Sequence, residues 1–303
     1  MRIGIDLGGT KIEAMAFDSA NRELARRRVP TPHDSYEETV DCIVGLVRWL
    51  ERETGARGSV GIGTPGAISP ATGLIKNANF TRLIGHPLDR DLAGLLARPV
   101  RIANDANCFA VSEAVDGAAA GAEIVFGAIL GTGCGGGIAL NGRVLTGANA
   151  IAGEWGHNQL PEPRDDERPG PACYCGRSGC IETFISGTGF GQDHERVTGA
   201  RLSPSDIVAR ADAGDAECQA SLDRYIDRLA RSLGMIVNII DPAVIVLGGG
   251  MSKATQLYEK VPRLWAPYIF SDSIATQLRP PVHGDASGVR GAAWLWDEGD
   301  GLG

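Results

Sequence analysis

A glycine-tipped hairpin at the start of the chain constrains the fold more than any other feature. The apolar run Arg2 to Leu7 predicts a buried strand, Gly8 and Gly9 follow it, and a second apolar run extends over 12–17. Glycine allows a tight turn and lets the backbone approach a bound group closely. The sequence therefore predicts a β-hairpin whose tip can face a ligand.

Helical and strand-like patterns alternate after this hairpin. Apolar residues recur every three or four positions across 36–53, which predicts an amphipathic helix. Strand-like runs follow at 59–63 and 100–103, and residues 106–117 show a helical pattern. This order predicts a mixed α/β fold.

The opening unit returns near residue 120. Segments 3–12 and 128–138 both consist of a strand, a glycine-rich tip and a second strand, which indicates two related halves. A chain of 303 residues also exceeds the length at which a single hydrophobic core stops growing. We therefore expect two lobes with a cleft between them. Further along, 161–171 is rich in proline and charge and predicts an exposed excursion, and 216–240 predicts a long helix.

The composition excludes several classes of protein. With 43% hydrophobic and 22% charged residues, the chain resembles an average folded protein and not a disordered or fibrous one. Its net charge of -8 disfavours duplex nucleic acid and anionic membranes as partners, because both attract clustered Lys and Arg. The N-terminus shows no export signal, and no apolar run approaches the ~20 residues of a membrane span. We therefore expect a cytoplasmic protein that binds small ligands.

The residues around the first glycine tip suit a phosphate group. The backbone N–H groups of Gly8 and Gly9 can approach an anion, and Thr10 and Lys11 add a hydroxyl and a positive charge. Asp6 ends the preceding strand, where a carboxylate can hold Mg²⁺ beside phosphate oxygens. A plain hairpin turn is the alternative, but the three polar side chains favour a phosphate site.

Two further glycine tips follow predicted strands. The second tip contains the pattern GxGxxG, but a strand and a turn follow it where a dinucleotide-binding fold needs a helix, so NAD is the poorer interpretation. The lysine-containing P-loop motif is also missing from the sequence. The second tip comprises Gly131, Thr132, Gly133, Cys134, Gly135, Gly136 and Gly137, and the third comprises Gly248, Gly249 and Gly250.

An Asn104-Asp105 pair lies between a predicted strand and a predicted helix. Loop residues at strand ends commonly build sites, and a carboxylate can accept the proton of a hydroxyl during phosphoryl transfer. We interpret Asp105 as the catalytic base and Asn104 as a residue that orients the acceptor. An Asp or Asn before a helix most often acts as its N-cap, and the two roles are compatible.

A cysteine cluster predicts a zinc site. Cys173, Cys175 and Cys180, with His157 upstream, supply three thiolates and one imidazole, which complete a tetrahedral set. A closed site of four ligands leaves no position for water, so the zinc should brace the structure. Such a brace would fix two nearby carboxylates, Glu154 and Glu182, which could then bind sugar hydroxyls; a solvated surface Glu is the common alternative.

Together these motifs resemble those of the ROK (repressor, open reading frame, kinase) family within the actin-like sugar kinases. The resemblance covers essentially the whole chain and rests on DLGGTK, Asn104-Asp105, GEWGHN and CYCGRSGCIETFISG. It implies a duplicated actin-like α/β fold with two RNase-H-like lobes around a central cleft. The first lobe would comprise residues 1–116, completed by a helix within 288–303, and the second would comprise 117–287 with the zinc site.

The resemblance also implies roles for individual residues. Asp105 is then the base, His157 both binds zinc and contacts sugar, and Gly248 to Gly250 form the adenosine loop. The cofactors implied are ATP, Mg²⁺ held by Asp6, and structural Zn²⁺. The implied sugar contacts are Gly66, Asn79, Asn104, Asp105, Glu154, His157 and Glu182. The first tip would contact ATP through Gly4, Ile5, Asp6, Leu7, Gly8, Gly9, Thr10 and Lys11.

Several stretches are similar to bacterial fructokinases of this family, namely KNANF, ANDANCFAVSEAVDGAAAGA and DASGVRGAAWLW. The expected reaction transfers a phosphoryl group from ATP to the 6-hydroxyl of D-fructose. N-acetylglucosamine, glucose and mannose are the alternative acceptors, chosen by contacts around Gly66, Ala67 and Asn79. Some family members are repressors with an added helix-turn-helix, but a first strand that begins at Arg2 disfavours that class. The sequence leaves a homodimer open.

Overall fold

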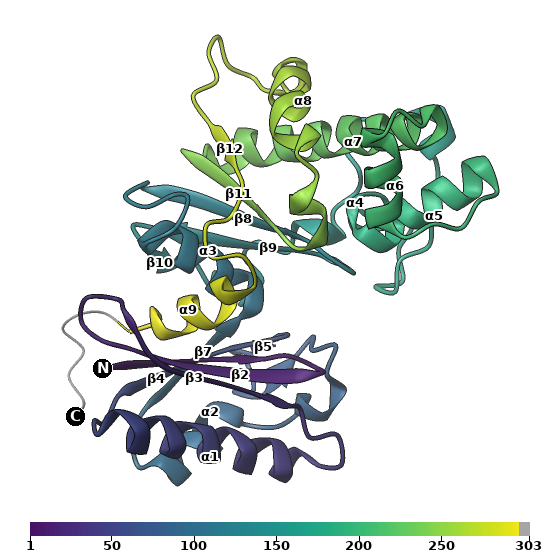
Figure 1. Cartoon of the computed structure of the whole chain (residues 1–303). Helices are drawn as coiled ribbons and strands as arrows, with labels where there is room; N and C mark the ends of the chain where they lie inside the picture. Colours follow the sequence, from purple (N-terminus) through teal and green to yellow (C-terminus); the bar gives the residue numbers. More distant parts are fainter. Residues whose placement is uncertain (297–303) are drawn as a thin grey trace.

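A computed structural model describes residues 1–296, which form two α/β lobes with two helices between their sheets (Figure 1). Each lobe is built on one five-stranded sheet, and the strand order of the second sheet repeats that of the first. The expected duplicated, actin-like α/β fold is therefore confirmed. Within residues 1–296, no helix is both long enough and apolar enough to cross a bilayer.

The sheet of the first lobe has the order β3-β2-β1-β4-β7. Its strands β1, β2 and β3 are antiparallel neighbours, while β4 runs parallel to β1 and β7 runs parallel to β4. Helices α1 and α2 cover one face of this sheet and α9 covers the other (Figure 1). The bounds are β1 Arg2–Leu7, β2 Lys11–Phe17, β3 Glu23–Pro30, α1 Tyr36–Thr54, β4 Ser59–Thr64, α2 Leu88–Leu96, β7 Val100–Asn104, α3 Asp105–Val115 and α9 Ser287–Ala293, with a small hairpin of β5 Ala67–Ile68 and β6 Ile75–Lys76.

The sheet of the second lobe has the order β10-β9-β8-β11-β12. Here β8, β9 and β10 are antiparallel neighbours, and β11 runs parallel to both β8 and β12. Helices α7 and α8 lie on the side of this sheet that faces away from the first lobe (Figure 1). The bounds are β8 Ile124–Leu130, β9 Cys134–Leu140, β10 Arg143–Val144, α4 Glu182–Ile185, α5 Gly187–Thr198, α6 Pro204–Asp212, α7 Ala216–Ile240, β11 Val244–Gly248, α8 Gln256–Leu264 and β12 Gln277–Arg279.

Glycines allow helix α9 to pack closely against both the first sheet and helix α3. A Cβ atom at Gly4 of β1 would come within 1.9 Å of the Val289 carbonyl oxygen in α9. A Cβ atom at Gly291 of α9 would come within 1.7 Å of the Cys108 carbonyl oxygen in α3. Any larger side chain at these positions would push the helices apart. The glycines therefore set how closely α3, α9 and the sheet pack.

A buried carboxylate joins the two central helices. Glu113, fully buried in α3, accepts hydrogen bonds from the backbone N–H groups of Ala118 (2.8 Å) and Val282 (3.1 Å). It also accepts one from the Ser287 hydroxyl at 2.8 Å. Because Val282 and Ser287 lie where the chain returns from the second lobe into α9, Glu113 anchors this crossover to α3.

The predicted elements agree with the structure at most positions. The strand predicted over 124–130 and the helix predicted over 216–240 have the bounds of β8 and α7. By contrast, β9 begins at Cys134, four residues before the strand expected at Ile138, because the glycines of the second tip are themselves part of the strand. The expected boundary at 116/117 falls between α3 and β8, with one sheet on each side. The division into two domains remains a prediction, and residues 297–303 of the expected closing helix lie outside the described part.

The excursion predicted over 161–171 is only partly exposed. Its residues Asp165–Glu167 form a 3-10 turn, and the Glu167 side chain is buried. The Glu167 carboxylate lies 2.8 Å from both the Arg228 and the Arg231 guanidinium groups of α7. The other residues of the segment are exposed or half-buried, as expected, and Glu167 is the exception because two arginines far along the chain neutralise its charge.

Candidate active site

Two carboxylates of the first lobe, one in a strand and one at the start of a helix, line the same cavity. Asp6 in β1 and Asp105 at the start of α3 line a cavity of about 440 Å³ together with Gly248, Gly249 and Lys253. Burial raises the pKa of Asp6 to about 6, and the charge of Asp105 adds to the rise. Burial also raises the pKa of Asp105, although N–H groups that bond to its carboxylate counteract part of the shift. The structure thus brings together the expected Mg²⁺ ligand and the expected base.

Asn104 and Asp105 also cap helix α3. The Ala106 N–H group donates to Asn104 Oδ1 (2.9 Å) and to Asp105 Oδ1 (2.8 Å). The amide of Asn104 donates in turn to the Gly66 carbonyl oxygen at 3.3 Å. Asp105 can therefore cap the helix and still line the cavity. The hydrogen bond from Asn104 places Gly66 beside Asn104.

Gly66 has a packing role that the sequence did not indicate. Its φ of +86° lies in the left-handed region, and a Cβ atom there would come within 2.4 Å of the Lys76 carbonyl oxygen. Asn79, the other residue expected to select the sugar, is exposed on the loop after β6. The contact of both residues with sugar stays a prediction.

The first glycine tip is held by a residue that sequence reasoning missed. The Gly8 N–H group donates to the Lys11 carbonyl oxygen at 3.0 Å, which closes the turn. The Thr31 hydroxyl donates to the Gly8 carbonyl oxygen (2.7 Å), and the Thr31 N–H group donates to the Thr10 carbonyl oxygen (3.1 Å). Thr31 follows β3, a strand that was not predicted, so no local signal pointed to it. Of the other expected contacts, Ile5 and Leu7 are fully buried, as core residues of β1.

The second and third glycine tips lie beside the N-terminus of α5. The Gly187 N–H group donates to the Gly131 carbonyl oxygen (2.7 Å), and the Thr188 hydroxyl donates to the Thr132 carbonyl oxygen (2.8 Å). A groove of about 780 Å³ opens here, lined by Gly131, Thr132, Thr188, Arg201, Gly250 and Lys253 among others. Lys253 lines both this groove and the carboxylate cavity. Lys253 lies three residues after the third glycine tip, and this closeness in sequence could have marked it as a candidate site residue.

The last glycines of the second tip pack against backbone. A Cβ atom at Gly136 would come within 2.6 Å of the Gly153 carbonyl oxygen, and one at Gly137 within 2.2 Å of the Ala106 carbonyl oxygen. Gly137 therefore allows β9 to lie against the start of α3, where Asp105 stands. A packing role is visible for these residues, while their expected contact with a nucleotide stays a prediction.

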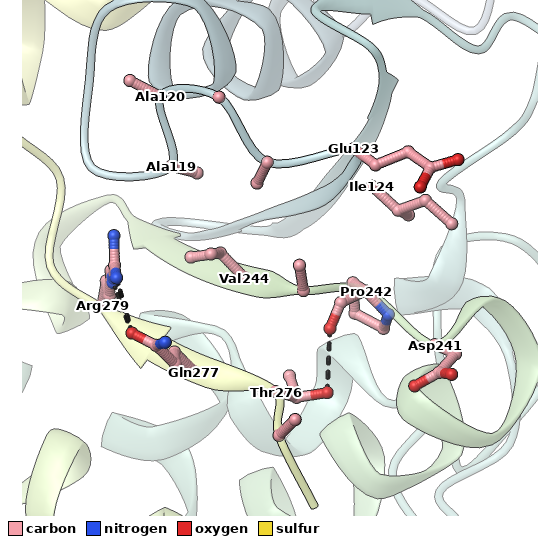
Figure 2. Close-up of a pocket in the computed structure, with 14 residues that line it drawn as sticks. Ala119, Ala120, Glu123, Ile124, Asp241, Pro242, Val244, Thr276, Gln277 and Arg279 are labelled. Carbon is pink, nitrogen blue, oxygen red and sulfur yellow. Dashed lines mark hydrogen bonds between the residues drawn. The ribbon is translucent and has the colours of Figure 1, made fainter.

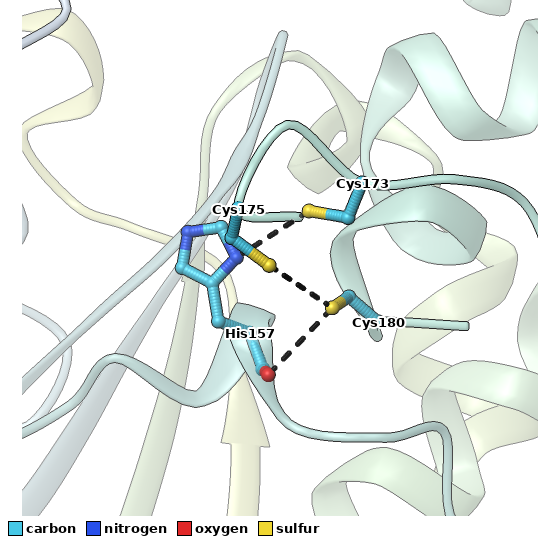
Figure 3. Close-up of side chains that lie close together, drawn as sticks. All are labelled: His157, Cys173, Cys175 and Cys180. Carbon is cyan, nitrogen blue, oxygen red and sulfur yellow. Dashed lines mark hydrogen bonds between the residues drawn. The ribbon is translucent and has the colours of Figure 1, made fainter. Parts of the chain in front are cut away.

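The expected zinc ligands come together in space (Figure 3). The ligand atoms of His157, Cys173, Cys175 and Cys180 all lie within 4.8 Å of one another. Cys173 Sγ lies 3.6 Å from His157 Nδ1, and Cys175 Sγ lies 3.6 Å from Cys180 Sγ. Ligands bound tetrahedrally to zinc at about 2.0–2.3 Å stand roughly 3.5–3.8 Å apart, whereas a disulfide needs about 2.05 Å. The four residues therefore fit a closed tetrahedral metal site.

The electrostatics of this cluster favour a thiolate at Cys175. Hydrogen bonds from Arg177 lower the pKa of Cys175 to about 6. The neighbouring Tyr174 behaves in the opposite way: partial burial and the charges of Glu182 and Glu154 raise its pKa to about 12. The Tyr174 hydroxyl therefore stays protonated at neutral pH, and two expected sugar-binding carboxylates act on it.

Glu182 links the metal-binding segment to the second glycine tip. It begins α4 two residues after Cys180, and its Oε2 accepts a hydrogen bond from the Cys134 N–H group at 2.8 Å. Glu154 precedes His157 by three residues, and its negative charge contributes to the raised pKa of Asp105. A hydrogen bond thus joins the segment that follows Cys180 to the second tip, and the charge of Glu154 reaches the expected base.

A further cavity lies away from these residues (Figure 2). It has a volume of about 510 Å³ and is lined by residues 119–124, 241–244 and 275–277 and by Arg279. These segments include the amino ends of β8 and β11, whereas the glycine tips follow the carboxyl ends. The Thr276 hydroxyl donates to the Pro242 carbonyl oxygen (2.8 Å), and Arg279 Nε donates to Gln277 Oε1 (3.0 Å). The Thr276, Gln277 and Arg279 side chains of this cavity are therefore engaged in hydrogen bonds within its lining.

Comparison with known proteins agrees with this arrangement. The ROK family profile matches residues 2–299. An N-acetyl-D-glucosamine kinase from Salmonella typhimurium (strain LT2) is 43% identical over 303 residues, covering 97% of this chain and 99% of that one. The crystal structure of a ROK hexokinase from Thermus thermophilus superposes with a TM-score of 0.86 at 34% identity, covering 97% of each chain. A ROK family glucokinase from Streptomyces griseus, solved with glucose and AMPPNP, gives a TM-score of 0.75 at 26% identity and covers 97% of this chain and 98% of its own. The chain therefore belongs to the ROK family.

Proposed function

We propose that this chain is an ATP-dependent hexose kinase, that N-acetylglucosamine is its acceptor, and that Asp105 is the general base. The observation that carries the proposal is the shared cavity of Asp6 and Asp105 beside the third glycine tip. A base next to a metal-binding carboxylate and an anion-binding loop is the arrangement that phosphoryl transfer to an alcohol requires. The groove beside α5, which meets this cavity at Lys253, then receives the adenosine.

The chain's residues divide the work of the reaction. The Gly8 N–H group closes the turn, so Gly9, Thr10 and Lys11 are the residues of the first tip that bind phosphate oxygens. Asp6 would hold Mg²⁺, which neutralises charge on the phosphates when bound. Asp105 accepts the proton of the attacking hydroxyl as the new P–O bond forms. Its raised pKa improves it as a proton acceptor, because a base works best when its pKa approaches the working pH.

The acceptor lies on the side of Asp105 that carries the metal cluster. Asn104 caps the same helix as the base, the charge of Glu154 acts on the base, and Glu182 binds the second tip. His157, Cys173, Cys175 and Cys180 would hold structural Zn²⁺, which stiffens the segment that bears both glutamates. A stiffened segment binds sugar with a lower ordering cost.

The choice of N-acetylglucosamine over fructose rests on relatives. Proteins that are 43% identical over 97% of this chain are N-acetyl-D-glucosamine kinases. The expectation of D-fructose relied on short similar stretches and finds less support. Glucose phosphorylation is a weaker alternative, supported by the glucokinase and hexokinase structures at 26% and 34% identity.

The base assignment can be tested with Asp105→Asn. An asparagine keeps the shape and can still accept the Ala106 N–H group, but it cannot take a proton. We expect kcat with ATP and N-acetylglucosamine to fall by about 10²–10⁴-fold, while sugar affinity measured by calorimetry stays within about threefold. The exposed Asp272→Asn serves as the control and should match the wild type. Wild-type turnover in Asp105→Asn would refute the role of Asp105, and a wild type that phosphorylates no hexose would refute the proposed function.

A further inference from the structure

Lys253 lies at the junction of the two cavities of the candidate site. It lines both the groove beside α5 and the cavity that holds Asp6 and Asp105. It ends a 3-10 turn over Gly250–Lys253, which directly follows β11 and the third glycine tip. A ligand that extends from the groove into the carboxylate cavity therefore passes this residue.

Hydrogen bonds and packing hold the turn that carries Lys253. The Ser252 hydroxyl donates to the Gly249 carbonyl oxygen (2.7 Å), and the Tyr258 hydroxyl of α8 donates to the Ser252 carbonyl oxygen (2.7 Å). Ser252 and Ala254, on either side of Lys253, are buried, whereas Lys253 itself is exposed. The backbone of the turn is therefore fixed, and the lysine side chain extends from it.

The charges around the carboxylate cavity are unbalanced. Three acidic side chains line it, namely Asp6, Asp105 and Asp285. Among the described residues of the lining, Lys253 is the only basic one. No hydrogen bond or ion pair within residues 1–296 engages the Lys253 ammonium group, so its charge is available to a ligand.

A polyphosphate suits this position. The phosphate chain of ATP is strongly negative, and the carboxylates of the cavity would repel it unless cations compensate. Mg²⁺ compensates part of this charge when bound, and a lysine ammonium group binds phosphate oxygens as a point charge. Lys11 begins β2 of the first sheet and Lys253 follows β11 of the second, so the two lysines come from different lobes.

From this geometry we propose that Lys253 binds the phosphate chain of ATP where the chain passes from the groove into the carboxylate cavity. The inference rests on the proposed hexose kinase function and adds a nucleotide-binding residue to it. The adenosine lies in the groove, on the far side of Lys253 from the carboxylates. The lysine charge therefore sets the affinity for the triphosphate and not the affinity for the nucleoside.

The test compares wild type, Lys253→Met and Lys253→Arg. Methionine keeps an unbranched side chain but removes the charge, whereas arginine restores the charge. For Lys253→Met we expect the KM for ATP, and the Kd for ATP from calorimetry, to rise about tenfold, which is the loss of one hydrogen bond to a charged group at an exposed site. The Kd for adenosine and the KM for N-acetylglucosamine should match the wild type. Lys253→Arg should recover most of the ATP affinity.

Lys260→Met is the matched control. Lys260 also belongs to the second lobe, but its ammonium group binds the Asp223 carboxylate at 2.8 Å. It lines neither the groove nor the carboxylate cavity. The Kd values of this variant for ATP and for adenosine should both match the wild type.

Two outcomes for Lys253→Met would overturn the inference. An unchanged Kd for ATP would show that the ammonium group does not bind the phosphates. Equal weakening of ATP and adenosine binding would assign Lys253 to the nucleoside or to the structure of the loop. If the wild type phosphorylates no hexose, the proposed function fails and this inference fails with it, whereas an active wild type with an unaffected Lys253→Met variant rejects the inference alone.

Discussion

Glu167→Gln tests the buried ion pairs that hold residues 161–171, the segment that precedes Cys173. Burial alone would raise the pKa of Glu167, but hydrogen bonds from Arg231 and Arg228 outweigh it and lower the pKa from 4.5 to about 2. A shift of about 2.5 pKa units corresponds to about 3 kcal/mol of stability at neutral pH. Each arginine keeps a second carboxylate, Asp193 at 3.2 Å from Arg228 and Asp227 at 3.0 Å from Arg231. Because both arginines remain paired, the loss of unfolding free energy in Glu167→Gln should stay at about 3 kcal/mol and not exceed it.

The sign of the pH dependence follows from the lowered pKa. The folded state keeps Glu167 ionised to lower pH than the unfolded state does, so its contribution is complete above the unfolded value and is lost as pH falls toward the folded value. The difference in unfolding free energy between wild type and Glu167→Gln should be about 3 kcal/mol at pH 7 and about 1 kcal/mol at pH 3.

Urea denaturation of both proteins at several pH values measures this difference. The exposed Glu259→Gln, which removes an ion pair with Arg263 on the surface of α8, is the matched control and should cost less than about 1 kcal/mol. A Glu167→Gln variant that loses less than about 1 kcal/mol at pH 7, or whose deficit does not shrink on acidification, would refute the reasoning.

Two further predictions concern the metal cluster and the second glycine tip. Removal of zinc by a chelator should lower the melting temperature and weaken sugar binding together, because the metal orders the segment that carries Glu154 and Glu182. Scanning fluorimetry measures the melting temperature and calorimetry measures the sugar affinity. An unchanged melting temperature after verified metal loss would reject that coupling. Gly137→Ala should cost about 1–3 kcal/mol and reduce kcat, since the new Cβ atom would meet the Ala106 carbonyl oxygen next to Asp105. Gly45→Ala, where a Cβ atom meets nothing within 4 Å, should be neutral or stabilising, and equal effects of the two changes would contradict the packing argument.

Features with a local signal were predictable from the sequence. Periodicity alone placed β8 and α7 at their observed bounds, and the glycines marked the second and third tips, which line the groove beside α5. The spacing of Cys173, Cys175 and Cys180 also anticipated the cluster with His157. In each case the determining residues lie close together in sequence or belong to a recognisable pattern.

Features that depend on long-range contacts were not predictable. Glu167 is buried only because Arg228 and Arg231, more than 60 residues later, neutralise it. The start of β9 was placed too late, because glycines lack the alternation of apolar and polar side chains that marks a strand. The structure shows that Gly137 packs closely against α3. Thr31 likewise gained its role from a partner that the fold brings near, the Gly8 carbonyl oxygen.

The central claim is that this chain transfers the phosphoryl group of ATP to N-acetylglucosamine. The most direct test measures kcat/KM by coupled ADP release with N-acetylglucosamine, glucose, mannose and fructose under the same conditions, with identification of the sugar phosphate formed. The account predicts the highest kcat/KM for N-acetylglucosamine, at least about tenfold above fructose, a difference of about 1.4 kcal/mol in transition-state binding. A higher kcat/KM for fructose, or no ADP release with any hexose, would contradict it.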